Sequence, residues 1–301
     1  MYKNIIPGLL SFDTELKALN GFYFSDNFDF YNNIKKKSNF HYKLSIDSKL
    51  QISDKYDFRN GFYFRNLESY YYHHGLNLKF KYDYINKEFV FNKFYSLIPF
   101  EIGRIFPVGK VIADIIDLDL FLDGYIIFRA SFCFQYKGQN IGIIAPSFNG
   151  KTTFLEKILN NKNARYISED NLIIDIDKNV IYPTMSRTQN KLSSIGSRRK
   201  TDIRGVLSAG NTIYDGPVSL DKLFIIVNST TKNQYRHHKT IFEAFFLKSL
   251  YFLEDFFVRS YIFENNLTFD VYQQISKIKN LNIEYKFLNI KNFNFNSIFE
   301  N

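Results

Sequence analysis

The sequence is poor in the residues on which covalent and metal-based scaffolds depend. Its 301 residues include one cysteine, Cys133, and no tryptophan. One cysteine cannot form an intramolecular disulfide or a cysteine-based metal cluster, and this scarcity fits a reducing compartment. No uninterrupted apolar run approaches the ~20 residues that a membrane-spanning helix needs. These absences exclude a disulfide scaffold and predict a soluble, cytoplasmic protein that does not act in a membrane.

Positive charge, in contrast, is in excess. Lysine and arginine number 39 against 30 acidic residues, a formal net charge of +9, which is typical of proteins with an anionic partner. The basic residues are spread along the chain and form no long arm or tail. They alternate with aromatic residues in segments such as 79–84. A biased genome would produce the same alternation, so we do not expect a nucleic-acid partner.

The order of sequence patterns predicts three segments. Residues 1–95 contain short apolar runs separated by turn residues and lack helical periodicity, which predicts a β-rich N-terminal module. In residues 96–122, isoleucine and valine recur at helical spacing and are interrupted by Pro107, which predicts a helical connector of two helices. Residues 123–301 are then expected to form one α/β domain.

The second domain is organised around residues 139–159. An apolar run at residues 141–145 indicates a short buried strand, and residues 154–159 indicate the start of an amphipathic helix. Between them, residues 145–152 read Ala-Pro-Ser-Phe-Asn-Gly-Lys-Thr. This segment fits the phosphate-binding pattern G-x-x-x-x-G-K-[ST] at every fixed position except the first, where Ala145 replaces glycine.

The chemistry of this loop favours nucleotide binding over an ordinary strand-to-helix turn. Gly150 allows the backbone to approach a phosphate, and successive N–H groups at a helix N-terminus attract anions. Lys151 can reach the β- and γ-phosphates, and the Thr152 hydroxyl can coordinate Mg²⁺. The candidate nucleotide-binding residues are Ser147, Asn149, Gly150, Lys151, Thr152 and Thr153.

Further elements are predicted on both sides of the loop. Residues 125–134 and 139–145 should form a hairpin that turns at Lys137-Gly138 and leads into the loop. An apolar-rich segment at residues 242–263 predicts one long core helix. The other predicted strands are residues 164–168, 172–177, 180–183, 223–227 and 283–288.

An acidic pair follows the loop at a defined spacing. Glu169 and Asp170 stand between two predicted strands, and Asp170 lies nineteen positions after Lys151. Phosphoryl transfer needs a carboxylate to hold the metal and a group to deprotonate or position the nucleophile. We expect the pair at the end of a strand, facing the phosphate loop. The alternative is a surface turn between two strands.

Together, residues 143–153 and 167–171 resemble the HPr kinase/phosphorylase-like family of P-loop kinases, which is related in fold to phosphoenolpyruvate carboxykinase. In that family a hairpin leads into the phosphate loop, a short helix follows, and an acidic pair comes about twenty residues after the lysine. The resemblance covers roughly residues 124–288. It implies an α/β P-loop kinase core, with the β-rich N-terminal module outside it.

The resemblance also implies roles for individual residues. Lys151 would bind the nucleotide phosphates, and Thr152 and Asp170 would hold Mg²⁺. Glu169, which stands where the family usually has aspartate, would act as the base or position the nucleophile. Family members often carry His-Ala in the preceding strand, where this chain has Arg129-Ala130. An arginine cannot act as a base there, although it can bind phosphate.

Four arginines are candidates for a clamp on the acceptor or its phosphate, because a guanidinium offers a planar fork of donors. They are Arg129, Arg187, Arg198 and Arg204. For the last three, the alternative is a solvated loop face.

These patterns lead to two expected functions. The first is an ATP- and Mg²⁺-dependent kinase that transfers the γ-phosphate to a hydroxyl of a peptide, small protein or metabolite. The second is a nucleotide-binding regulatory or partner-recruiting protein without transfer activity. The oligomeric state stays open, and a homo-oligomer is one option.

Overall fold

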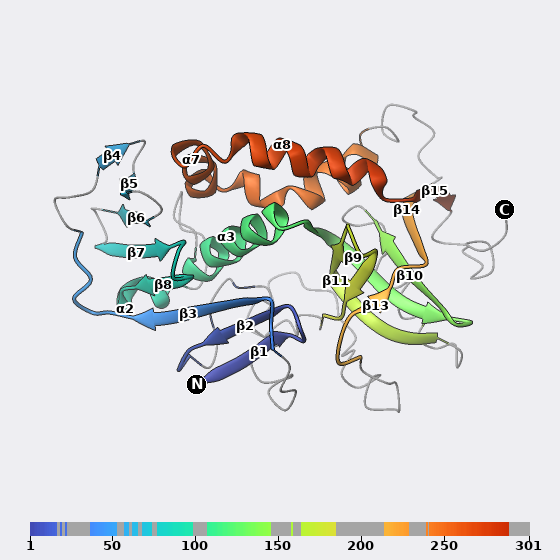
Figure 1. Ribbon diagram of the computed structural model, residues 1–301, viewed down its shortest axis with the longest axis horizontal. Coiled ribbons are helices and arrows are strands. Elements are labelled where there is room, and N and C mark those ends of the chain that lie inside the picture. The colour runs from blue at the N-terminus through green and yellow to red at the C-terminus, as the bar shows by residue number, and fades with distance from the viewer. Residues whose placement is uncertain are drawn as a thin grey trace. The chain divides into compact units, whose positions relative to one another are not determined.

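The protein is a mixed α/β chain that divides into two compact units (Figure 1). The first unit comprises residues 1–123 and 251–276, and the second comprises residues 124–250 and 277–301. The computed structural model describes residues 1–16, 19, 22, 37–52, 57–59, 62–65, 68–73, 77–98, 107–145, 158, 164–184, 214–228, 239 and 241–288.

The predicted β-rich N-terminal segment forms a sheet of eight described strands in the order β1-β2-β3-β8-β7-β6-β5-β4. Strand β3 pairs in parallel with β2 and β8, and the remaining pairs are antiparallel. Buried and partly exposed residues alternate along β7, as expected for a sheet with one face on the core. The strands are β1 (Tyr2–Ile6), β2 (Leu10–Asp13), β3 (Phe40–Ile46), β4 (Asp57–Arg59), β5 (Phe62–Arg65), β6 (Glu68–His73), β7 (Leu78–Asp83) and β8 (Glu88–Phe91).

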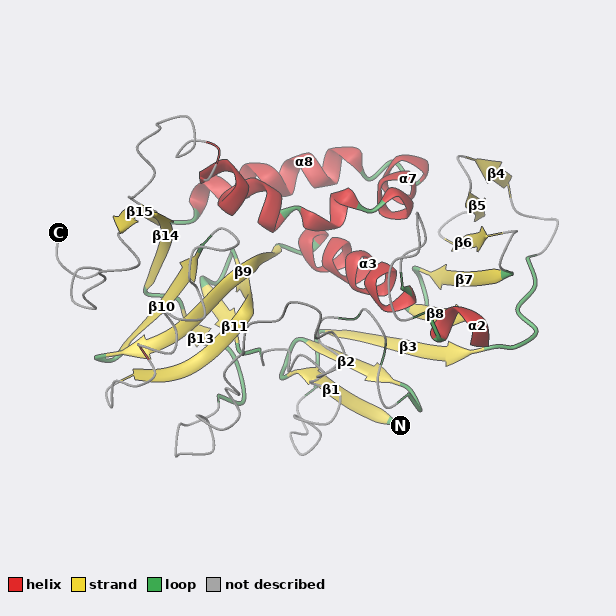
Figure 2. Ribbon diagram, turned by 180° about the vertical axis from the view of Figure 1, so that it is seen from behind, coloured by secondary structure: helices red, strands yellow, loops and turns green. Residues whose placement is uncertain are grey.

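Helix α3 (Val108–Leu122) forms part of the core of this unit and lies between the sheet and helix α7 (Phe256–Glu264) (Figure 2). Thirteen of its fifteen residues are buried, including three aspartates. A helix that is buried on all sides is typical of a core element, and this placement explains why the predicted connector is so apolar. The short helix α2 (Lys93–Ser96) precedes it.

A buried carboxylate joins α3 to the strands. Asp119 Oδ2 accepts hydrogen bonds from the Tyr42 hydroxyl at 2.8 Å, the Tyr82 hydroxyl at 2.6 Å and the Lys87 ammonium at 2.8 Å. The Lys87 charge offsets part of the cost of burying a carboxylate, and charge-assisted bonds of this kind are strong. Burial and the Asp119 charge both raise the pKa of Tyr42 and Tyr82, so these phenols stay protonated as donors.

The two-unit division differs from the predicted boundary, because residues 251–276 belong to the first unit instead of the second. The physical reason is aromatic packing. The Phe257 ring of α7 lies 5.1 Å from the Phe62 ring and 5.9 Å from the Phe80 ring, both in edge-on geometry. Such pairs bury large apolar areas and add specific ring contacts. Helix α7, which comes late in the chain, therefore packs against strands of the N-terminal sheet.

Residues 242–263 do not form the single helix that their composition predicts. They form the π-helical turn η3 (Glu243–Leu247), the 3₁₀ turn η4 (Tyr251–Glu254) and α7. The break has a local cause, since the Asp255 side chain accepts a hydrogen bond from the Val258 N–H at 3.2 Å. An N-cap starts a new helix at that point.

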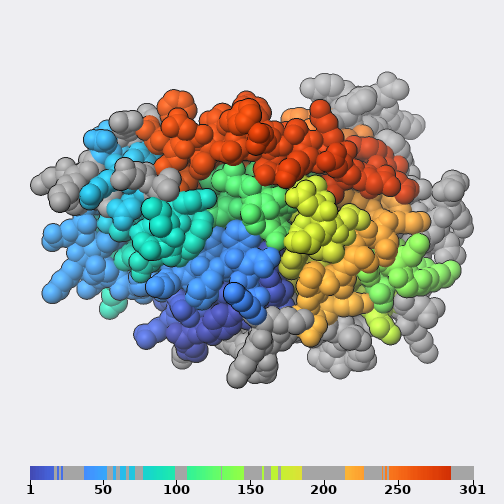
Figure 3. Space-filling model, in the orientation of Figure 1, coloured from blue at the N-terminus to red at the C-terminus, as the bar shows by residue number. Residues whose placement is uncertain are grey.

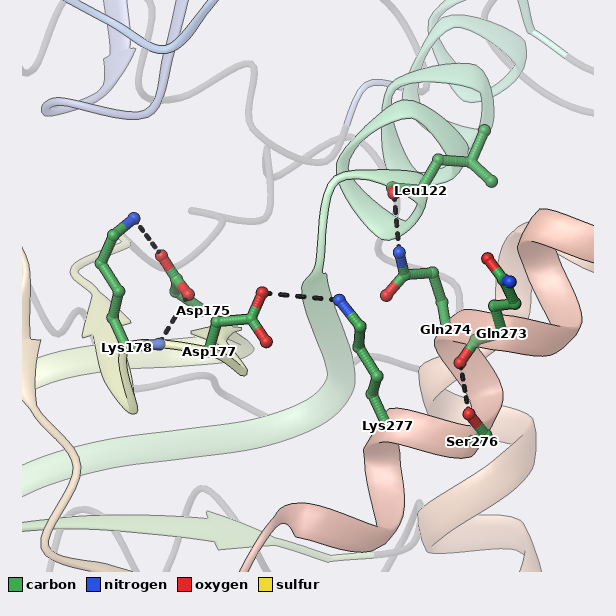
Figure 4. Close-up of polar contacts among 8 residues, drawn as sticks. All are labelled: Leu122, Asp175, Asp177, Lys178, Gln273, Gln274, Ser276 and Lys277. Carbon is green, nitrogen blue, oxygen red and sulfur yellow. Dashed lines mark hydrogen bonds and ion pairs between the residues drawn. The ribbon is translucent and has the colours of Figure 1, made fainter.

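Helix α8 (Thr268–Lys277) follows α7 and closes the first unit. Its Gln274 side chain donates a hydrogen bond to the Leu122 carbonyl at the end of α3, at 2.9 Å (Figure 4). On the face seen in Figure 3, the orange and red atoms of α7 and α8 lie at the surface. Phe263, Phe269 and Tyr272 of these two helices are exposed to solvent and do not contribute to the core.

The second unit contains a sheet of seven described strands in the order β13-β12-β11-β9-β10-β14-β15. Strands β10, β14 and β15 are parallel to one another, whereas β9 is antiparallel to both β10 and β11. The strands are β9 (Tyr125–Tyr136), β10 (Gln139–Ile144), β11 (Ala164–Asp175), β12 (Val180–Tyr182), β13 (Val218–Ser219), β14 (Lys222–Asn228) and β15 (Ile283–Leu288). A short 3₁₀ turn, η5 (Ile278–Asn280), precedes β15.

The predicted hairpin is confirmed. Strands β9 and β10 pair over six positions, and Lys137 and Gly138 turn with φ of 49° and 80°. Two successive residues with positive φ are typical of the turns that match strand twist.

The next turn, between β11 and β12, is fixed by the Asp175 side chain. It accepts hydrogen bonds from the Lys178 N–H at 3.0 Å and the Lys178 ammonium at 2.8 Å. Asp177 in the same turn forms an exposed ion pair with Lys277 at 3.5 Å (Figure 4).

Candidate functional site

The strand register brings the acidic pair level with the end of β10. Ser131 of β9 is the Cα partner of Ile144, the last residue of β10, on one side and of Asp170 of β11 on the other. Since neighbouring strands lie about 4.8 Å apart, the Cα atoms of Ile144 and Asp170 are roughly 10 Å apart. The candidate phosphate loop begins directly after β10, at the buried Ala145 and beyond. The backbone of the acidic pair therefore lies one strand away from the origin of the loop.

The sequence predicts that the acidic pair lies at the end of a strand, but in the structure the pair lies within one. Residues 164–168 and 172–177 were expected as two strands, but β11 runs from Ala164 to Asp175 without a break. The twelve residues of β9 supply partners along its whole length, and this pairing overrides the low strand propensity of Glu, Asp and Asn. Register shifts on both sides bracket the pair, and bulges of this kind change the local direction of a strand.

Most of the predicted ligands lie outside the residues that the structure describes. These are Ser147, Asn149, Gly150, Lys151, Thr152 and Thr153 of the loop and the arginines Arg187, Arg198 and Arg204. For Glu169 and Asp170 the backbone is described. Of the predicted helix after the loop, the described residue is Ile158, which is helical and fully buried.

The remaining candidate, Arg129, is half-buried in β9. Its Cα partner in β11 is Asn171, the residue that follows Asp170. Because Arg129 lies two residues beyond Ser131, it is also beyond the level at which β10 ends. The structure thus brings Arg129 and the acidic pair into neighbouring strands at one edge of the site.

The position of β10 in the sheet is one where ligands commonly bind. The strand lies between an antiparallel neighbour, β9, and a parallel neighbour, β14. In α/β sheets, ligands bind outside the carboxyl ends of the parallel strands. The carboxyl ends of β10, β14 and β15 point the same way, so the loop after β10 starts at such an edge.

Strand β10 also forms a tightly packed base for this edge. A Cβ atom added to Gly142 would lie 2.9 Å from Leu172 Cδ2 and 2.9 Å from Leu223 Cδ1. The isoleucines Ile141, Ile143 and Ile144 are fully buried. A strand packed this closely has little freedom to shift, and it therefore fixes the start of the loop.

A second segment leaves the sheet beside the acidic pair, a feature that the sequence did not reveal. Thr184 is fully buried, and its hydroxyl donates to the Asn171 carbonyl at 2.9 Å. Its own carbonyl accepts a hydrogen bond from the Tyr166 hydroxyl at 3.0 Å. Residues 185–213, which carry three of the four candidate arginines, follow directly. A threonine after a short strand carries no distinctive sequence signal. Only the hydrogen bonds and strand pairing of the folded structure reveal this anchor.

Other reactive groups in the described part of the second unit do not add to the site. Cys133 is fully buried, and burial raises the pKa of its thiol, so it is not a nucleophile at neutral pH. Within the same described part, no cluster of three or more histidine, cysteine or carboxylate side chains could hold a metal ion.

Comparison of the chain with models of known protein families, with curated proteins and with solved structures gives no match.

Proposed function

We propose that the second unit is a P-loop kinase core resembling HPr kinase, which transfers the γ-phosphate of ATP to a hydroxyl of a peptide, small protein or metabolite. The observation that carries the proposal is the row Ile144–Ser131–Asp170. It combines the order of the two sequence motifs with a spatial relation between them that the sequence does not contain. The end of the strand that leads into the loop and the backbone of Asp170 lie roughly 10 Å apart across the sheet. A phosphate loop and a carboxylate are the two halves of a phosphotransfer site.

The chemistry divides among a few side chains. Lys151 and the backbone N–H groups around Gly150 bind the phosphates. Glu169 takes the proton of the acceptor hydroxyl as the oxygen–phosphorus bond forms, and the bond from the γ-phosphorus to ADP breaks. This role requires β11 to rearrange locally at the pair, because adjacent residues of a regular strand, such as Glu169 and Asp170, point to opposite faces of the sheet. Arg129 stabilises negative charge on the transferred group.

Thr152 and Asp170 would hold Mg²⁺, which neutralises charge on the β- and γ-phosphates when it is bound. Each oxygen ligand lies about 2.1 Å from a bound Mg²⁺. The backbone of Asp170 lies level with the end of the strand that leads into the loop carrying Thr152, which supports this assignment.

A second candidate function is a nucleotide-binding protein that recruits a partner and does not transfer phosphate. The observation in its favour is the environment of Glu169. Its backbone is paired within the continuous strand β11, opposite Phe132, and glutamate replaces the aspartate of the resembled family. A base held in a strand has less freedom to approach an acceptor than one at the end of a strand.

Two variants separate these functions. Lys151→Ala should abolish ATP binding measured by calorimetry, because it removes the charge that contacts the β- and γ-phosphates. Asp170→Asn should retain ATP binding but lose Mg²⁺-dependent transfer of label from γ-labelled ATP to candidate acceptor peptides and proteins. Charge-matched controls are Lys137→Ala, in the exposed β9–β10 turn, and Asp177→Asn, which is 67% exposed. Full transfer by Asp170→Asn contradicts its metal role, and tight ATP binding by the wild type without any labelled acceptor favours the second candidate.

A further inference from the structure

A buried hydroxyl next to the acidic pair has no partner. Ser168 is fully buried in β11, and its Oγ makes no hydrogen bond. Leaving a buried polar group unpaired costs roughly 1–3 kcal/mol, so such a group in a folded protein calls for a reason.

Ser69 of the first unit has a buried, unpaired hydroxyl as well, but Ser168 differs from the hydroxyls that surround it in the second unit, which have local partners. Ser131 donates to the Phe128 carbonyl at 2.6 Å, and Thr184 donates to the Asn171 carbonyl at 2.9 Å. Thr184 is bridged to Ser168 itself, so the two residues share one environment. A serine hydroxyl rotates freely to find an acceptor. The Ser168 hydroxyl is left without an acceptor, although it lies directly beside the proposed site.

The register places Ser168 and Asp170 on the same face of the sheet. Their Cα partners are Cys133 and Ser131, which are also two residues apart, so the strand is regular between them. Residues i and i+2 share a face and have Cα atoms about 6.6 Å apart. A serine hydroxyl in this relation can reach a carboxylate on the same face.

We propose that Ser168 is a positioning residue for the metal site, whose hydroxyl donates a hydrogen bond to the Asp170 carboxylate when that carboxylate holds Mg²⁺. The inference rests on the proposed function. A donor to a metal-bound carboxylate fixes its orientation, and losing such an outer partner typically costs 10–100-fold in metal affinity. The hydroxyl stays unpaired until the ion is bound, so the protein gives up some stability to hold the site ready.

The test measures metal affinity and stability together. Mn²⁺, as a stand-in for Mg²⁺, is titrated into the protein with a non-hydrolysable ATP analogue and followed by electron paramagnetic resonance. Ser168→Ala should weaken Mn²⁺ binding about tenfold. Its melting temperature should be unchanged or higher, because the variant removes an unpaired buried group. Ser168→Thr keeps the hydroxyl and should bind Mn²⁺ nearly as the wild type does.

The control and the contradicting outcomes are defined by the same two measurements. Ser131→Ala, in the neighbouring strand, should lower the melting temperature and leave Mn²⁺ affinity unchanged, because its hydroxyl already has a backbone partner. A Ser168→Ala variant that melts lower and binds Mn²⁺ as the wild type does would show that Ser168 is structural and overturn the inference alone. A wild type that binds neither the ATP analogue nor Mn²⁺ would overturn the proposed function and the inference with it.

Discussion

At the residue scale, Gly142 shows how closely the base of the site is packed. It is not in a turn and has no positive φ, so backbone freedom does not explain a glycine in the middle of β10. The explanation is space, because Leu172 and Leu223 occupy the volume that a Cβ would need. The glycine thus allows the side chains of Leu172 from β11 and Leu223 from β14 to pack directly against the backbone of β10.

Gly142→Ala should therefore destabilise the protein by about 1–3 kcal/mol, the usual cost of overpacking a core. Urea denaturation measures this change in the free energy of unfolding. Adding Leu172→Ala to the variant should recover part of the loss, since the two substitutions share one contact and their effects should not add. Strict additivity in this double-mutant cycle would contradict the steric explanation.

At the element scale, the start of α7 depends on one side chain. Asp255 is buried and caps the helix, and Lys110 lies 3.9 Å from its other carboxylate oxygen. Burial raises the pKa of Asp255, and the Lys110 charge opposes that shift. The cap matters beyond α7, because α7 carries Phe257 into contact with the N-terminal strands.

Replacing the cap should loosen this packing. We expect Asp255→Ala to lower the free energy of unfolding by about 1 kcal/mol or more, the typical cost of losing an N-cap. Asp255→Asn should recover most of that stability, since asparagine caps helices equally well. Thermal unfolding of the two variants measures the difference. Equal losses for both would instead assign the effect to the Lys110–Asp255 charge pair.

The elements of the site show where prediction from sequence succeeds and where it stops. The β9–β10 hairpin was predictable, because apolar alternation and a turn that ends in Gly138 are local signals. The continuous strand β11 was not, because Glu169, Asp170 and Asn171 favour a turn by local propensity. Pairing with the long strand β9 decided the outcome.

At the scale of the whole molecule, the net charge is concentrated in three segments. Residues 146–157 carry two basic residues and one acidic residue. Residues 185–213 carry six basic residues and one acidic residue, and residues 229–240 carry three basic residues and no acidic residue. Together they account for the full formal net charge of +9, and the rest of the chain is balanced. The basic residues appeared evenly spread along the sequence, but the excess of positive charge falls in these three segments of the second unit.

Two of the three segments leave the sheet of the second unit at the same edge, whereas the third follows β12, which runs antiparallel to β11. One follows β10, one follows β14, which is parallel to β10, and one follows Thr184 beside the acidic pair. Residues 185–213 contain no aromatic residue, and base-stacking platforms depend on aromatic side chains. The charge of residues 185–213 therefore fits an acidic partner better than a site that stacks nucleic-acid bases.

We expect the protein to prefer peptide acceptors rich in Asp and Glu and to bind them more weakly as salt rises, because screening reduces attraction between exposed charges. Fluorescence anisotropy of a labelled acidic peptide between 50 mM and 500 mM NaCl measures this. Replacing Arg198, Arg199 and Lys200 together by glutamine should weaken binding and flatten its salt dependence. Replacing Lys43, Lys49 and Lys137, which lie elsewhere, should change neither. Tighter binding of single-stranded RNA than of the peptide would contradict the expectation.

The described part of the chain contains no helix long and apolar enough to cross a membrane. This agrees with the absence of long apolar runs in the sequence.

The sequence by itself determined the features that depend on neighbours along the chain. These are the strand alternation of the N-terminal sheet, the β9–β10 hairpin, and the order and spacing of the loop and the acidic pair. The tertiary structure alone decided that Asp170 lies level with Ile144 and that α7 joins the first unit. The reason is physical. Strand register and aromatic packing are set by residues far apart in the sequence, and a bulge of one residue in β11 changes which residues face one another.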